Sequence, residues 1–324
     1  MKIFSKRILF VSILTLLMTI TIVVLPVSSA EFPSKPISLI VCTGPGGGFD
    51  TYARGVAQVM EKYVGKPIVI KNIPGAGGRT GTNAVYRARP DGHTIGILNV
   101  PGLIASQYLM ETKFDMSKFE WIGGCNIETY VMAANAKIPY NTIADLQKSK
   151  TPFNHGFYGK GSTAFNVAII GLNAMKISFT AVTGYAGSAE AIVGCIRGDV
   201  DLLTYATTTI LPYVKSGDLK PIAIYSVERD EFYPDTQTVA EAGFKNLAVL
   251  GVPRLFAGPP GLPKDRVKFL EEALLKALKD PELIAWSKQA KRPLTAIDSQ
   301  TAVELVKDSG EIYQQYVPLL KKYY

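Results

Sequence analysis

Four glycine-rich stretches are the parts of this sequence best suited to binding a small molecule. They combine Gly with Ser, Thr and Asn, carry few charges, and occupy residues 43–50, 72–81, 157–163 and 183–188. Glycine permits positive φ and lets a ligand approach the backbone closely. Where a helix follows such a stretch, its first N–H groups are unpaired and lie at the positive end of the helix dipole. We therefore predict that these stretches bind an anion through main-chain N–H groups.

The same stretches do not match the motifs of nucleotide-binding enzymes. Phe49 stands where the dinucleotide pattern Gly-x-Gly-x-x-Gly needs its third glycine, and Lys160 is followed by Gly161 where a phosphate-binding loop needs Ser or Thr. The Gly-x-Ser-x-Gly motif of hydrolases does not occur. The two histidines, His93 and His155, are far from any metal-ligand spacing. The sequence therefore predicts no cofactor and no metal, and we expect binding without catalysis.

The glycine-rich stretches are expected to connect strands to helices. Apolar runs predict strands at residues 37–42, 67–71, 94–99, 130–134, 153–158, 177–182, 200–204 and 221–225. Apolar residues at three- and four-residue spacing predict helices at 53–64, 82–88, 142–149, 162–175, around 192–196, and at 264–278, 282–290 and 301–320. This alternation predicts an α/β fold of mostly parallel sheets flanked by helices. In such sheets, ligands bind beside the loops at the carboxyl ends of the strands.

The order of these elements predicts two lobes. The strand–helix pattern restarts near residue 130, and the last third of the chain is mostly helical. We assign residues 31–128 and 249–324 to one lobe and residues 129–248 to the other. The chain would then cross between the lobes twice, near residues 126–130 and 249–253.

The N-terminus has the composition of a secretory signal peptide. Three basic residues precede an apolar run at residues 8–25, and Ser28-Ser29-Ala30 supplies small residues for cleavage after Ala30. An uncleaved membrane anchor is the alternative, because the run is nearly long enough to span a bilayer. Without residues 1–30 the formal net charge falls from +8 to +5, with 32 basic and 27 acidic residues. The basic residues are scattered, so nucleic acid is not an expected partner.

Cysteine usage gives no sign of a metal or disulfide framework. Cys42, Cys125 and Cys195 are odd in number, far apart in the sequence and set in apolar segments. One disulfide is possible in an oxidising compartment, but we expect three buried free thiols.

A series of short motifs extends through almost the whole of the remaining chain. They are Phe-Pro-Ser-Lys-Pro-Ile (32–37), Gly-Pro-Gly-Gly-Gly-Phe-Asp (44–50), Ala-Arg (53–54), Asn-Ile-Pro-Gly-Ala-Gly-Gly (72–78), Pro-Asp-Gly-His-Thr (90–94), Gly-Asp-Val-Asp (198–201), Pro-Asp-Thr (234–236), Ala-Glu-Ala-Gly (240–243) and Ala-Gly-Pro-Pro-Gly-Leu-Pro (257–263). Each motif is weak alone, but their order and spacing resemble the extracytoplasmic receptors of tripartite tricarboxylate transporters, also called Bug-type receptors.

The resemblance implies a two-lobed periplasmic binding protein fold of type II, with two crossovers between the lobes. It also implies a small organic mono- or dicarboxylate in the cleft, a periplasmic location, membrane transporter subunits as partners, and a monomeric chain. Two alternatives stay open from the residues alone. One is an enzyme that acts on a small anionic or phosphorylated substrate, and the other is a ligand sensor that acts with a sensor kinase.

The glycine-rich stretches and the resemblance together predict the binding residues. They are Thr43, Gly46, Gly47, Gly48, Phe49, Asp50, Gly77, Lys160, Gly161, Ser162, Thr163, Tyr185, Ala186 and Asp201. Main-chain N–H groups at residues 46–48 and 161–163 are expected to hold the carboxylate, with positive φ at Gly47. Lys160 departs from the family pattern and is either a second anion contact or a solvated lysine. Asp50 is expected to cap its helix rather than contact a ligand, and Tyr185 to close over the ligand rather than pack.

Overall fold

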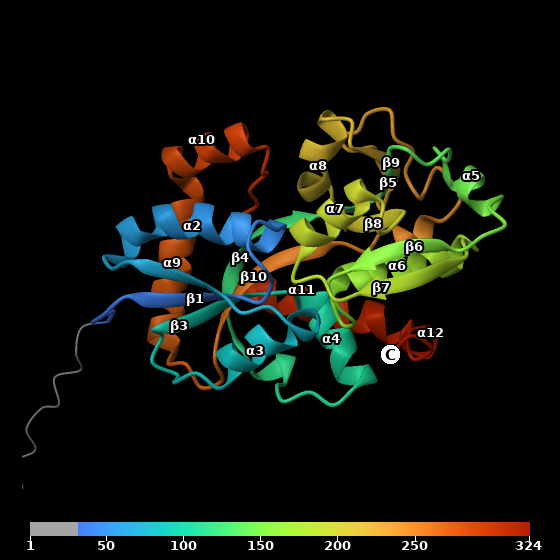
Figure 1. Cartoon of the computed structure of the whole chain (residues 1–324). Coiled ribbons are helices and arrows are strands. Elements are labelled where there is room, and N and C mark those ends of the chain that lie inside the picture. Colours follow the sequence, from blue (N-terminus) through green and yellow to red (C-terminus); the bar gives the residue numbers. More distant parts are fainter. Residues whose placement is uncertain (1–31) are drawn as a thin grey trace, which may run out of the picture. The chain divides into compact units, whose positions relative to one another are not determined.

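Two five-stranded sheets flanked by helices form the region that the computed structural model describes, residues 32–324 (Figure 1). Residues Lys35–Tyr324 make up one compact unit. The predicted signal peptide, its cleavage site after Ala30 and the alternative membrane anchor lie outside the described residues. Within the described range, no helix has the length and apolar character needed to cross a bilayer.

The first sheet has the strand order β2-β1-β3-β10-β4. Its strands are β1 (Ile37–Val41), β2 (Ile68–Asn72), β3 (Thr94–Leu98), β4 (Glu120–Glu128) and β10 (Val252–Gly258). Strand β1 is parallel to β2 and β3, whereas β10 is antiparallel to both β3 and β4. Helices α2 (Gly48–Val64) and α9 (Lys264–Lys279) pack on one face, with α10 (Pro281–Ala290) beside them. Helices α3 (Arg79–Tyr86), α4 (Val100–Leu109) and α11 (Ser299–Gln314) pack on the other.

The second sheet has the strand order β7-β6-β8-β5-β9. Its strands are β5 (Tyr130–Asn135), β6 (Phe153–Phe157), β7 (Phe179–Thr183), β8 (Leu202–Ala206) and β9 (Leu219–Ile224). Strand β6 is parallel to β7 and β8, and β5 is antiparallel to β8 and β9. The helices of this region are α5 (Ile143–Gln147), α6 (Thr163–Ala174), α7 (Ser188–Arg197) and α8 (Thr207–Lys215), and α12 (Val317–Leu320) packs against α4 and α6. We call the first sheet with its helices lobe 1 and the second sheet with α5–α8 lobe 2.

Local sequence explains where the long helix α2 begins and ends. Tyr52, Val56 and Met60 recur every four residues and are buried, which gives the helix one apolar face. Gly65 ends it with φ 74°, the left-handed conformation that glycine adopts at low cost, and its N–H donates to the Glu61 carbonyl. Helix α2 is therefore fixed at both ends by glycine, and its N-terminus meets the loop after β1.

Each lobe has its own apolar core. In lobe 1, Leu98, Leu103, Trp121 and Leu255 belong to one buried cluster on the face covered by α3, α4 and α11. In lobe 2, Phe157 of β6 meets Phe165 of α6 edge to face, with ring centroids 4.9 Å apart. Cys42, Cys125 and Cys195 are buried free thiols, as predicted.

The predicted α/β fold of two lobes is confirmed, but the sheets are mixed rather than mostly parallel. In the first sheet, β10 adds antiparallel pairs with β3 and β4, and in the second sheet β5 is antiparallel to β8 and β9. The sequence did not indicate β4, β10, α4 or α8. Strand β10 contains Pro253 and Arg254, which are uncommon in a central strand, and its cross-strand partners stabilise it nonetheless. Helix α8 begins with three β-branched threonines and contains Pro212, so its local propensity is poor.

Only Thr129 separates β4 of the first sheet from β5 of the second. Strand β10 begins at Val252 and returns the chain to the first sheet. These are the two places where a crossing was expected. The exact residue limits of the two lobes stay a prediction.

Candidate functional site

The glycine-rich stretches of the two lobes meet one another. The Gly44 N–H donates to the Ala186 carbonyl (3.1 Å). Gly77, with φ 69°, lies so near the Lys160 carbonyl that a Cβ on it would be 2.1 Å from that oxygen. On α4, the Gly102 N–H donates to Thr163 Oγ1 (2.9 Å). Loops that are distant in sequence therefore form one contact surface between the lobes.

A small cavity of about 20 Å³ lies beside this contact surface. Its walls come from both lobes, and lobe 1 contributes part of β10. The lining residues are Thr43, Gly48, Phe49, Tyr130, Tyr158, Ser188, Tyr205, Ala206, Thr209, Val252 and Arg254. No carboxylate, histidine, cysteine or lysine is among these lining residues. The cavity is instead lined by hydroxyl groups, aromatic rings, backbone and one guanidinium.

Three helices present their first turns to this cavity. Helix α2 starts at Gly48, α7 starts at Ser188, and the first turn of α8 contains Thr209. The first N–H groups of a helix have no partner within the helix, and the helix dipole makes that end positive. Three such ends around one cavity favour a negative charge, although Glu128 already accepts from the Thr208 N–H in the first turn of α8.

Hydroxyl groups add further donors and acceptors. Among the described residues, the buried Thr43 Oγ1 has no hydrogen-bond partner. The rings of Tyr158 and Tyr205 stack with centroids 6.0 Å apart, and Asn99 Nδ2 donates to the Tyr158 hydroxyl (3.3 Å). Burial raises the pKa of Tyr158 above its ordinary value, so this hydroxyl stays protonated at neutral pH.

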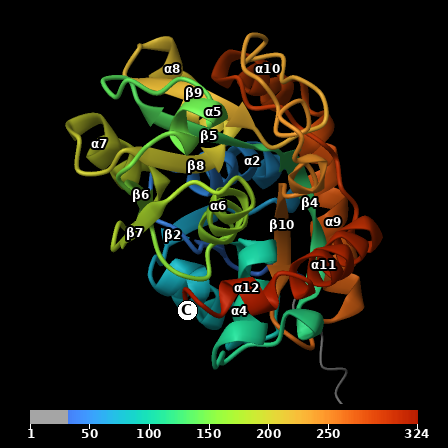
Figure 2. The same cartoon turned by 90° about the vertical axis from the view of Figure 1, so that its right-hand side faces the viewer.

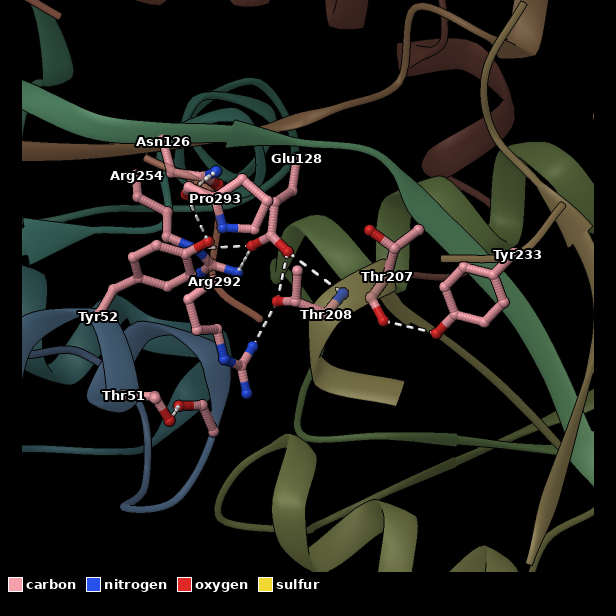
Figure 3. Close-up of polar contacts among 11 residues, drawn as sticks. Thr51, Tyr52, Asn126, Glu128, Thr207, Thr208, Tyr233, Arg254, Arg292 and Pro293 are labelled. Carbon is pink, nitrogen blue, oxygen red and sulfur yellow. Dashed lines mark hydrogen bonds and ion pairs between the residues drawn. The ribbon is translucent and has the colours of Figure 1, made fainter. Parts of the chain in front are cut away.

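A buried ion pair within lobe 1 is connected by hydrogen bonds to α8 of lobe 2 (Figure 3). Arg254 of β10 donates through Nε (2.9 Å) and Nη2 to Oε2 of Glu128, the last residue of β4. The other oxygen, Oε1, accepts from the Thr208 hydroxyl (2.5 Å) and the Thr208 N–H (3.3 Å) at the start of α8. Arg292 Nη1 donates to the same Thr208 hydroxyl. Glu128 therefore links strands of lobe 1 to a helix of lobe 2 at the first crossing.

Thr43, Gly48 and Phe49 are the predicted binding residues that line the cavity. Gly46 and Asp50 instead hold the loop together: Asp50 accepts from the Gly46 N–H (2.9 Å), and also from Arg54 Nε (2.9 Å) and Asn72 Nδ2 (2.8 Å). Burial by itself raises the pKa of Asp50, but these hydrogen bonds outweigh burial and bring the pKa below its ordinary value. These three hydrogen bonds occupy most of the acceptor capacity of Asp50. The expected capping role is wrong, because the N-cap of α2 is Gly47 and no side chain caps it.

The predicted conformation of Gly47 is wrong. Its φ is −80°, an ordinary value, and the residue with positive φ is its neighbour Gly46 (77°). Gly47 has a different reason to be glycine, because a Cβ there would lie 2.7 Å from Ser188 Oγ of the facing lobe. The requirement is for close approach between α2 and α7.

The stretch at residues 160–163 packs against lobe 1 beside the cavity and does not line it. Lys160 is exposed, and its Nζ donates to the Tyr324 backbone oxygen (3.3 Å). Gly161 lies against Ser106 of α4. Ser162 caps α6 by accepting from the Phe165 N–H (3.1 Å).

Thr163 and Gly77 also serve the contact between the lobes. The Thr163 hydroxyl donates to Asn99 Oδ1 while accepting from Gly102, so all its bonds reach lobe 1. Gly77 faces the Lys160 carbonyl, as described above. These residues position the two loops and contribute to the cavity only through that contact.

Three further predicted residues also lie outside the cavity lining. The Tyr185 ring packs over Gly194 of α7, where an added Cβ would be 2.7 Å from the Tyr185 hydroxyl. The Ala186 N–H donates to Glu190, and its carbonyl accepts from Gly44. Asp201 lies before β8, at the end of the strand opposite Ala206, and accepts from the Asn154 N–H (2.7 Å). In this structure Tyr185 packs within its own lobe.

The sequence interpretation missed most of the cavity wall. Those residues are Tyr130, Tyr158, Ser188, Tyr205, Ala206, Thr209, Val252 and Arg254. The sequence did contain one sign of Arg254: it is the only charged residue in the apolar run Val-Pro-Arg-Leu-Phe-Ala-Gly. A charge in a run destined for burial indicates a buried partner or a functional role.

A two-lobed α/β fold with an anion-favouring cavity between the lobes defines a solute-binding protein of the periplasmic binding protein class. Residues 52–320 match the sequence model of the protein family described as tripartite tricarboxylate transporter family receptor. The chain belongs to this family, as its motifs indicated.

Relatives and solved structures agree with this assignment. A UPF0065 protein of Agrobacterium vitis is 30% identical over 273 residues, which cover 82% of this chain and 78% of that protein. The structure of periplasmic binding protein BugD has a TM-score of 0.82 at 26% identity, covering 89% of this chain and 98% of BugD. MatC of Rhodopseudomonas palustris, solved with bound malate, has a TM-score of 0.81 at 24% identity, covering 88% of this chain and all 100% of MatC, and shows the same fold.

Proposed function

We propose that this receptor captures a small organic mono- or dicarboxylate between its lobes and delivers it without chemical change. The lobes must move apart to admit the ligand, because the cavity of about 20 Å³ has room for little more than one water molecule. The observation that carries the proposal is the convergence of three helix N-termini, those of α2, α7 and α8, on one cavity. This arrangement favours an anion, and hydroxyls of Thr43 and Tyr158 add donors for carboxylate oxygens. The malate bound in MatC, a protein of the same fold, is a ligand of this class.

The cavity chemistry favours binding over catalysis. General acid–base or nucleophilic catalysis needs a nucleophile beside a base, and the lining residues include Ser188 but no histidine, carboxylate or lysine to activate it. The lining contains one cation, Arg254, which is paired with Glu128. A phosphate dianion would require more positive charge than a carboxylate, so the phosphorylated substrate is the weaker alternative.

The setting of the receptor is also part of the proposal. We infer that the chain is exported, cleaved after Ala30 and active as a monomer in the periplasm, where membrane transporter subunits of the same system receive the ligand. The composition of residues 1–30 and the family membership support this setting. A sensor kinase is the competing partner.

A thermal-shift screen of the protein purified after export tests the binding proposal. The panel holds mono- and dicarboxylates, the matching amides, inorganic phosphate and sugar phosphates. A carboxylate at ~100 times its Kd should add about 2.7 kcal/mol to the free energy of unfolding and raise Tm. Hits are then titrated by calorimetry and recovered for mass measurement. Stabilisation by phosphorylated compounds alone, or recovery of an altered compound, would contradict the proposal.

A further inference from the structure

Arg254 combines deep burial with an unused donor group. Its side chain is 1% exposed, and it lines the cavity between the lobes. Nε and Nη2 are bound to Glu128, whereas Nη1 has no hydrogen-bond partner among the described residues. A guanidinium carries five N–H donors, so Arg254 keeps donor capacity for a ligand. Because Arg254 lines the cavity, a ligand there can approach its guanidinium.

The position of the Arg254 guanidinium is fixed from several sides. Its Cζ lies 4.8 Å from the ring centre of Phe49 and 4.7 Å from that of Tyr52, both on α2. Gly48 gives it room, because a Cβ there would be 2.7 Å from Nη2. A charged group held this firmly loses little conformational freedom when it binds a ligand, so its contribution to affinity is large.

The surrounding charges leave this cluster positive. Arg254 and Arg292 supply two cations against the single carboxylate of Glu128. The Glu128 oxygens accept from Arg254 and Thr208, so their acceptor capacity is occupied. An anionic ligand can therefore enter without competing against a free carboxylate.

We propose that Arg254 is a specificity-determining residue that donates through Nη1 to a carboxylate of the ligand, while Glu128 offsets part of its charge. This inference rests on the proposed function and deepens it. Recognition then uses a charged side chain as well as main-chain N–H groups. The ligand class becomes acids that bring an ionised carboxylate to Arg254, and the corresponding amides and esters are rejected.

Three variants separate this role from a purely structural one: Arg254→Gln, Glu128→Gln and the double variant. The probes are formate, acetate, succinate and malate, titrated by calorimetry, with circular dichroism and Tm confirming that each variant is folded. Arg254→Gln should weaken the best carboxylate at least ~30-fold. Glu128→Gln removes the neutralising charge and keeps the donor, so affinity should stay within about threefold of wild type or increase. The double variant removes both charges of the Arg254–Glu128 pair while Arg292 remains, and it should bind as weakly as Arg254→Gln.

A structural ion pair gives the opposite pattern. Both single variants would then weaken binding alike, because each breaks the same pair, and the double variant would recover toward wild type. That pattern overturns the inference, as does wild-type affinity in Arg254→Gln. If wild-type protein binds neither these four acids nor any carboxylate of the thermal-shift panel, the proposed function fails and the inference fails with it. Carboxylate binding that survives Arg254→Gln removes the inference alone.

Discussion

His155 is a fully buried histidine that lies outside the cavity lining. It is 0% exposed on β6, its Nε2 lies 3.0 Å from Thr204 Oγ1, and its ring stacks on Phe157 with centroids 4.3 Å apart. Burial lowers the pKa of His155 to about 3, because the interior disfavours the charged imidazolium. This histidine is therefore neutral in the folded protein at any physiological pH.

The neutral state of His155 predicts a pH-dependent stability. Between its folded pKa near 3 and its unfolded value of about 6.5, only the unfolded chain binds the proton, so stability falls as pH decreases. His155 should account for a loss of about 2 kcal/mol between pH 7 and pH 5. Urea unfolding at both pH values should show a smaller loss in His155→Gln than in wild type. Equal losses in the two proteins would contradict this assignment.

The first turn of α2 depends on glycine because it faces the first turn of α7. A valine at position 47 would put methyl groups against Ser188, whose Oγ would be 2.7 Å from the new Cβ. The single methyl of alanine is a smaller obstacle, because a serine hydroxyl can rotate away from it. The contact lies between the lobes, so the obstacle should hold them apart without unfolding either.

Gly47→Val is therefore expected to weaken carboxylate binding about 10- to 100-fold, which corresponds to 1–3 kcal/mol of overpacking. Its Tm without ligand should fall by only a few degrees. Gly47→Ala should have a smaller effect. Gly310→Ala on α11 is the control, because the nearest atom to its new Cβ is 3.5 Å away. Calorimetry that finds wild-type affinity in Gly47→Val would refute the need for close approach.

The C-terminal residues make a third connection between the lobes. Helix α11 packs against α4 and β4 of lobe 1, and α12 continues onto α4 and α6 (Figure 2). Beyond α12, Tyr323 stacks on Phe179 of β7 with centroids 5.6 Å apart and donates to Asn173 Oδ1 (3.0 Å). Tyr324 meets Phe165 edge to face and donates to Asn166 Oδ1 (2.7 Å). The tail, Tyr323 and Tyr324, therefore contacts lobe 2, whereas α11 packs on lobe 1.

Removing both tail side chains should shift the molecule toward open forms, because each supplies a ring contact and a hydrogen bond to lobe 2. The double variant Tyr323→Ala/Tyr324→Ala should bind carboxylate about tenfold more weakly. Small-angle scattering should show a smaller radius of gyration when wild-type protein is saturated with ligand. The ligand-saturated variant should keep a larger radius of gyration than the ligand-saturated wild type. Tyr108→Ala removes a tyrosine that is 44% exposed on α4 and serves as the control. Identical profiles for variant and wild type would show that the tail does not influence closure.

The sequence by itself determined the class of element at most positions, the glycine-rich loops and the family. Helical periodicity and strand-like apolar runs depend on neighbours within a few residues, so α2, α6, α9 and the strands β1, β3 and β6 could be predicted. The loop that follows β1 was identified correctly because glycines report local backbone needs. Three residues of this loop and the helix start that follows it, Thr43, Gly48 and Phe49, were therefore predicted and do line the cavity.

The tertiary structure alone decided which residues meet at the cavity. Glu128 and Arg254 pair across 126 positions of sequence, and the first turn of α8 reaches the cavity although its threonines favour a strand. Lys160 and Tyr185 lie in glycine-rich stretches but turn to the tail and to Gly194. Spacing along a chain fixes neither the direction of a loop side chain nor the partner across an interface. Those depend on how the two lobes pack, which no local pattern contains.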